Sequence, residues 1–305
     1  MKNVKQSVGI SICIITVFIA VIVAVIIVQQ ISFAESPEEM EPFAVRTVSL
    51  GDSTQENEGA YIDYSNVNDG YFMAKYTGDK LYAALSIEKE GDPEGKMDVY
   101  YLTEVNEYAA FPLYSDGNYT VKFYGYEREE DISTDDLLIK VELSVVFNEG
   151  VDPWLLPSVK CPFDENSQTT LRAKAIVEES KSEKDAAIKI ANYVTDNLEY
   201  DLETAEGDPI SRHRYISPDE ALLIGKATCG EFASITAAML RSQGIPAKII
   251  YGFPTKDFGN FDTYHAWNEA YVDGQWVRID TVNKPFFPGM NTLLPLKGYS
   301  PLITY

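Results

Sequence analysis

The spacing of apolar residues changes near residue 150, and this change most constrains the folds open to the chain. Between residues 44 and 152 the pattern has period two, which is typical of strands buried on one face. Runs of this kind cover Tyr71–Tyr76, Leu81–Ile87, Met97–Leu102, Tyr119–Phe123 and Ile139–Val145. Several short strands separated by turn signals predict a small antiparallel β-sandwich. This region contains neither histidine nor cysteine, so we expect it to have a structural or binding role.

From residue 153 onward the apolar spacing becomes helical. Helices are predicted after the N-cap signals at Ser182 and Ser217, and a third is predicted over residues 230–242. The strands predicted to follow cover residues 248–253, 265–272 and 275–280. Helices that precede a group of antiparallel strands indicate an α+β domain, which we place over residues 153–305.

The N-terminus carries a long apolar segment. Val8–Val28 is uncharged and long enough to cross the roughly 30 Å hydrocarbon layer as a helix. Two lysines precede it and the first acidic residue, Glu35, follows it, which favours a cytoplasmic N-terminus. We therefore predict a cytoplasmic end and a transmembrane signal anchor over residues 1–34, a stalk over residues 35–43, and a remainder outside the cytoplasm. Cleavage near Ala34, which would release a secreted protein, is the alternative.

Charge and cysteine content limit the partners. The formal net charge is −22 at pH 7, which repels nucleic acid and anionic lipid headgroups, so neither is an expected partner. No segment has the ligand spacing of a calcium loop or a zinc site, and we expect no metal and no cofactor. Cys13 falls in the predicted span. A disulfide between Cys161 and Cys229 and a reactive free thiol at Cys229 are both compatible with the sequence.

The C-terminal region holds the residue types needed for catalysis by a thiol. Cys229 stands immediately before a predicted helix, where unpaired amides and the positive end of the helix dipole stabilise a thiolate. The same amides could bind an oxyanion, and Gly230 allows a substrate to approach the backbone closely. The chain contains two histidines. His213 has no patterned neighbours and is interpreted as a solvated loop residue, which leaves His265 as the candidate base.

A predicted hairpin brings His265 close to a carboxylate. If Asp273-Gly274 is a two-residue turn, Trp267 lies opposite Asp280 on one face of the sheet. His265 shares this face and is a diagonal neighbour of Asp280, at about 7–8 Å between the backbones. We therefore predict that Asp280 orients His265, which accepts the proton of Cys229.

Three further residues are candidates for lining the cleft. Trp267 is close to His265, Gly230 follows the nucleophile, and Tyr200 comes directly after the first helix of the domain. For Trp267, a plain core position is an equally good interpretation.

Four motifs in this region are similar to those of a known group of proteins. They are GKATCGEFA at 225–233, MLRSQGIPA at 239–247, HAWNE at 265–269 and GQWVRID at 274–280. Together they resemble the transglutaminase-like superfamily, in particular bacterial transglutaminase-core proteins, over about residues 182–282. The resemblance implies a papain-like fold in which Cys229 is the nucleophile, His265 the base and Asp280 the third member of the triad.

Two positions depart from the family pattern. Ala227 stands where a glycine often precedes the small residue before the nucleophile, and Thr281 stands where a proline often follows the aspartate. Neither change removes a reacting atom. Members of the superfamily share a first half-reaction, in which a thiolate attacks an amide carbonyl and forms a thioester.

The sequence therefore predicts a membrane-anchored, extracytoplasmic cysteine acyltransferase or amide hydrolase at the bacterial cell surface. Its expected partners are the membrane, through the N-terminal helix, and a protein or cell-wall peptide substrate. A papain-like cysteine protease and a non-catalytic surface binding protein are the alternatives.

Overall fold

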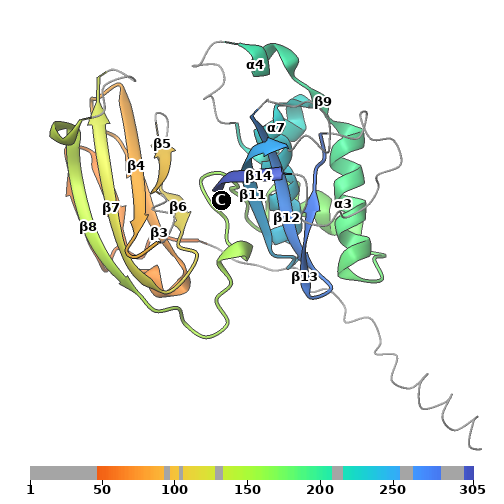
Figure 1. The fold of residues 1–305 in the computed structure, drawn as a ribbon, viewed down its shortest axis with the longest axis horizontal. Coiled ribbons are helices and arrows are strands. Elements are labelled where there is room, and N and C mark those ends of the chain that lie inside the picture. Colours follow the sequence, from red (N-terminus) through yellow and green to blue (C-terminus); the bar gives the residue numbers. More distant parts are fainter. Residues whose placement is uncertain are drawn as a thin grey trace, which may run out of the picture. The chain divides into compact units, whose positions relative to one another are not determined.

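The computed structural model describes residues 47–92, 97–102, 106–127, 133–207, 216–254, 264–282 and 299–305. The chain has a mixed α/β fold whose four-stranded sheets are all antiparallel, as predicted at this level (Figure 1). The predicted membrane span, stalk and cleavage site lie outside the described residues, as does His213. Within the ranges given above, no helix is both long and apolar enough to span a bilayer.

The N-terminal region contains two antiparallel sheets of four strands each. The first has the order β1-β2-β3-β6 and comprises Thr54–Asn57, Ala60–Asp63, Tyr71–Tyr76 and Ala109–Pro112. The second has the order β5-β4-β7-β8 and comprises Met97–Tyr101, Tyr82–Lys89, Gly117–Tyr126 and Leu137–Val145. Burial alternates along β8, as the period-two pattern of its sequence predicts.

Aromatic side chains pack between the two sheets. The ring centroids of Tyr76 in β3 and Phe123 in β7 are 5.9 Å apart, and those of Tyr100 in β5 and Phe111 in β6 are 5.1 Å apart. The two sheets therefore share a core. Short 3-10 helices at Val67–Asp69 and Thr134–Asp136 occupy connections in this region, and a third, Pro153–Leu155, comes directly after it.

The C-terminal region begins with helices. Its described helices are α2 (Gln168–Val177), α3 (Glu183–Asn197), α4 (Leu202–Glu206), α6 (Pro218–Ile224) and α7 (Cys229–Arg241). Ser182 and Ser217 are N-caps, as predicted, and each side chain accepts a hydrogen bond from the backbone N–H three residues later. Gly225 ends α6 in the left-handed conformation, with a φ of 75°.

A third four-stranded antiparallel sheet, with the order β13-β12-β11-β14, supports this region. Its strands are Gln275–Ile279, His265–Val272, Ala247–Pro254 and Tyr299–Thr304. Helix α7 contacts both β11 and β12, so it lies against the sheet (Figure 1). The N-terminus of α7 and the start of β12 carry Cys229 and His265, respectively.

The β12–β13 hairpin has the predicted register. Val272 pairs with Gln275, and Glu269 pairs with Arg278. The two turn residues, Asp273 and Gly274, have φ values of 50° and 78°, as a type I′ turn requires. This register keeps His265 and Asp280 on one face of the sheet.

Arg241, the last residue of α7, is fully buried and joins three separate segments of the chain. Its guanidinium donates hydrogen bonds to the carbonyl oxygens of Ala247, Leu156 and Tyr305, at 2.9, 2.8 and 3.3 Å. Replacing Arg241 with methionine would leave three buried acceptors without this donor. We expect the free energy of unfolding to fall by about 3 kcal/mol or more.

Chemical denaturation of the full chain tests this expectation. Arg172→Met, at a surface position of α2, is the matched control and should change the unfolding free energy by less than about 0.5 kcal/mol. Equal stability of the two variants would contradict a structural role for Arg241.

Candidate active site

Cys229 is the first residue of α7, so its sulfur lies at the positive end of the helix dipole. Thr228 is the N-cap residue. The Glu231 carboxylate accepts hydrogen bonds from the Thr228 hydroxyl and from the Thr228 backbone N–H, the latter at 2.8 Å. These contacts fix the turn that presents the cysteine. The pattern Thr-x-x-Glu is a known sequence signal for a helix start, and the prediction of a helix from residue 230 overlooked it.

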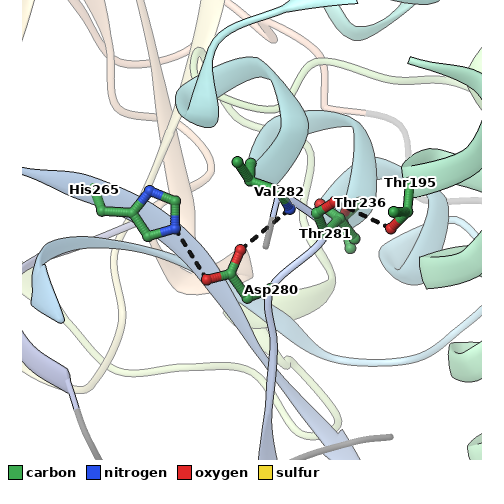
Figure 2. Close-up of polar contacts among 6 residues, drawn as sticks. All are labelled: Thr195, Thr236, His265, Asp280, Thr281 and Val282. Carbon is green, nitrogen blue, oxygen red and sulfur yellow. Dashed lines mark hydrogen bonds and ion pairs between the residues drawn. The ribbon is translucent and has the colours of Figure 1, made fainter. Parts of the chain in front are cut away.

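His265 and Asp280 are joined directly. Nε2 of His265 lies 2.9 Å from Oδ2 of Asp280, and the Asp280 side chain is almost completely buried (Figure 2). The other carboxylate oxygen accepts a hydrogen bond of 3.2 Å from the backbone N–H of Val282. Because Asp280 engages Nε2, Nδ1 is the ring nitrogen left to face Cys229.

The third predicted residue, Cys229, lies beside the imidazole, close enough to influence its pKa. Burial lowers the pKa of His265, but hydrogen bonds to Asp280 and Cys229, together with the charges of both groups, outweigh it and raise the pKa to about 10. At neutral pH the site therefore holds an imidazolium between a carboxylate and a sulfur.

Thr281, which stands where family members often have a proline, fixes the segment after Asp280. The Thr281 carbonyl accepts a hydrogen bond of 3.0 Å from the Thr195 hydroxyl in α3. The Thr281 hydroxyl lies 3.3 Å from the Thr236 hydroxyl in α7 (Figure 2). Thr281 thus ties the end of β13 to two helices, and it holds Asp280 without a proline.

Tyr200 contacts the cysteine. It lies in β9 (Glu199–Tyr200), which pairs in parallel with β10 (Lys226–Ala227), so Tyr200 is opposite Ala227. Burial, the charge of Cys229 and a hydrogen bond to its sulfur raise the pKa of Tyr200 to about 12, while a hydrogen bond from the Cys229 backbone N–H opposes this rise. The hydroxyl group is therefore a neutral donor beside the sulfur.

The other two cleft candidates occupy different places. Trp267 is 2% exposed, and its ring stacks near that of His265 at a centroid distance of 6.5 Å. It packs near the imidazole and contributes almost no exposed surface to a cleft. A Cβ atom on Gly230 would lie 3.0 Å from the hydroxyl of Tyr251, so the glycine allows a close approach by Tyr251.

The two described cysteines are not paired. Cys161 is fully buried and its thiol donates to the Ser234 carbonyl at 3.6 Å, while Cys229 is partly accessible and free. The disulfide that the sequence left open is therefore absent from the described residues. Among the described parts of the chain, no group of three or more His, Cys, Asp and Glu side chains is arranged to hold a metal.

Tyr251 and Tyr264 are site residues that the sequence analysis missed. Burial is the main cause that raises the pKa of each, and the charge of Cys229 adds to it. Tyr264 precedes His265 in the sequence, and this adjacency was the available signal. Tyr251 left no such signal, because its place beside Gly230 depends on the packing of β11 against α7.

The raised pKa of His265 predicts how stability depends on pH. A group whose pKa is higher in the folded chain than its ordinary 6.5 stabilises the fold fully below pH 6.5, and this contribution is lost as pH rises to about 10. We expect the stability advantage of the wild type over His265→Gln to shrink across this interval. Chemical denaturation at several pH values measures it, and a constant difference would contradict the prediction.

Comparison with known proteins agrees with the motifs. Residues 171–281 match the model of the transglutaminase-like superfamily, so the resemblance indicated by the sequence is confirmed. The match includes Cys229, His265 and Asp280.

Individual relatives are more distant. The chain is 26% identical over 115 residues to the kyphoscoliosis peptidase of Mus musculus, covering 35% of this chain and 16% of that protein. It is 28% identical over 138 residues to a UPF0252 protein of Archaeoglobus fulgidus, covering 40% and 43%. The chain thus spans less than half the length of these curated relatives. A candidate cysteine protease from Cytophaga hutchinsonii has a solved structure with a TM-score of 0.40, 18% identity, and coverage of 77% of this chain and 75% of that one.

Proposed function

We propose that this chain is an extracytoplasmic, membrane-anchored cysteine acyltransferase or amide hydrolase that acts on protein or cell-wall peptide amides. The observation that carries the proposal is the His265–Asp280 pair, joined at 2.9 Å, with the Cys229 side chain beside the imidazole. The proposed catalytic domain covers residues 153–305 and has a papain-like core. The sandwich-like region at residues 44–152 holds no part of this group and is assigned a structural or binding role.

In the first half-reaction the Cys229 sulfur attacks the amide carbonyl carbon. A C–S bond forms, the C–N bond breaks, and the protonated His265 donates its proton to the leaving amine. The product is a thioester on Cys229 and a free amine. Asp280 keeps the imidazole oriented through both steps and remains ionised.

Charge that develops on the carbonyl oxygen during attack needs donors near the sulfur. The Tyr200 hydroxyl lies beside the sulfur, and we assign it the role of turning from the sulfur to the carbonyl oxygen as this charge develops. In the second half-reaction water or another amine attacks the thioester, His265 accepts the proton of the attacking group, and the sulfur leaves. The acceptor decides between hydrolysis and acyl transfer.

A substrate screen tests the proposal. The purified full chain is incubated with a glutamine donor and a fluorescent amine, and separately with peptide substrates. Incorporation of the amine supports acyl transfer, while release of acid products or peptide fragments supports hydrolysis. The name of the mouse relative, a peptidase, is the reason to keep the second assay.

Iodoacetamide labelling separates an enzyme from a binding protein with the same residues. A thiolate reacts with the reagent and a thiol does not. Fast labelling of Cys229 at about pH 6, where an ordinary cysteine with a pKa near 8.5 is protonated, supports the proposal. Labelling no faster than that of a free thiol, together with no turnover, would refute it.

A further inference from the structure

Three aromatic residues form a continuous group beside the proposed nucleophile. Tyr251 and Phe253 lie in β11, and Tyr264 immediately precedes β12. The rings of Tyr251 and Tyr264 are stacked at a centroid distance of 5.9 Å, and those of Phe253 and Tyr264 meet edge to face at 5.8 Å. We call this group the aromatic wall.

The aromatic wall lies close to the proposed nucleophile. The Tyr251 hydroxyl lies against Gly230, the residue after the nucleophile, at 3.0 Å from the position of a Cβ atom. Tyr264 is the neighbour of His265 in the chain. The charge of Cys229 also contributes to the raised pKa of Tyr251 and of Tyr264, after burial, which agrees with their short distance from the sulfur.

The outer two members of the aromatic wall face solvent. Tyr264 is 46% exposed and Phe253 is 39% exposed, whereas Tyr251 is less exposed than either. Their side chains are uncharged at neutral pH, so a ligand meets apolar ring surface and not a charged group. Sites for small groups are typically lined in this way, with a few polar atoms that fix orientation. Here these polar atoms belong to Cys229, His265 and Tyr200.

We propose that Phe253 and Tyr264 bind an aromatic or large aliphatic group of the acyl donor, next to the carbonyl that Cys229 attacks. The proposal rests on the proposed function, because it names the substrate class of the same site. Its occupant is the acyl donor, since the aromatic wall begins beside Gly230, the residue that follows the nucleophile. Contacts with the two rings select such a group, because aromatic pairs contribute binding free energy beyond that from the burial of apolar area.

Two alkylating reagents test this selection without a known substrate. The full chain is treated with iodoacetamide and with N-benzyl iodoacetamide, and modification of Cys229 is followed by mass spectrometry of its peptide. The ratio of the two rates is divided by the ratio for a free cysteine thiol. We expect the benzyl reagent to be favoured by roughly 2- to 12-fold in the wild type, from ring contacts alone.

Variants assign the preference to the aromatic wall. Tyr264→Ala and Phe253→Ala should each reduce the normalised ratio toward one, and Tyr264→Phe should retain it. Tyr271→Ala is the matched control: Tyr271 is 40% exposed and pairs with Trp276 at 5.5 Å, but it lies at the other end of β12. At about 3.3 Å per residue it is roughly 20 Å along the strand from His265. This variant should keep the wild-type ratio.

Measurement at two pH values separates failure of this inference from failure of the proposed function. At about pH 9 an ordinary thiol also reacts, so the ratio can be determined even if Cys229 is not activated. A normalised ratio of one in the wild type, or equal ratios in Tyr264→Ala and Tyr271→Ala, overturns the inference. Slow labelling by both reagents at about pH 6 counts against the proposed function instead.

Discussion

Replacing Cys229 with alanine is expected to reduce turnover by at least about 10⁴-fold, because removal of a nucleophile that forms a covalent intermediate leaves only binding and oxyanion stabilisation. Modification by iodoacetamide at this position should disappear as well. The measurement is turnover of the donor substrate identified in the screen, by wild type and variant at equal concentration. Cys161→Ala is an informative companion, because its thiol is buried and donates to the Ser234 carbonyl.

The Cys161 variant should keep the activity while losing some stability, since it creates a small cavity next to α7. Turnover retained in the Cys229 variant would show that another group carries the reaction. If turnover falls in both variants in proportion to their loss of stability, the defect lies in folding and not in the chemical step.

Replacing Asp280 with asparagine is expected to lower turnover by roughly 10³- to 10⁴-fold. The amide has nearly the shape of the carboxylate, but it carries no charge and can present a donor to Nε2 of His265. The imidazolium would lose the group that stabilises it, and the neutral ring would be held in the wrong tautomer. Labelling of Cys229 at about pH 6 should slow accordingly, while labelling at about pH 9 should change much less.

Asp273→Asn is the matched control for this substitution. Asp273 is exposed in the hairpin turn and has a φ of 50°, a conformation that asparagine also tolerates. This variant should therefore leave both turnover and labelling close to those of the wild type. Equal effects of the two substitutions would contradict the role assigned to Asp280.

The hairpin shows why part of the site was accessible from the sequence. Strand alternation and the Asp273-Gly274 turn fix the register locally, so the proximity of His265 and Asp280 followed without knowledge of the remaining fold. The start of α7 was equally accessible, because caps and glycine stops are local signals. The predicted register and the bounds of β12 agree with the structure.

Other features depend on contacts between distant segments, and no local pattern carries them. Its place after a predicted helix made Tyr200 a cleft candidate, but Tyr200 reaches Cys229 only because β9 pairs with β10, two strands of two residues each. Arg241 falls within one of the sequence motifs, but no local signal predicts its buried hydrogen bonds to the carbonyls of residues 156, 247 and 305. The aromatic wall likewise forms from residues on two strands and requires β11 to lie beside β12. The proposed boundary near residue 152 stays a prediction.

The hairpin register also restricts how this chain can vary during evolution. Fifteen positions separate the imidazole from its carboxylate partner. Because side chains alternate between the two faces of a strand, one residue added or deleted between them would move the carboxylate to the opposite face of the sheet. The fold can tolerate single substitutions between these two residues. A change of length by a single residue would point the acid away from the ring, so descendants that keep the chemistry should keep the interval, or alter it by pairs.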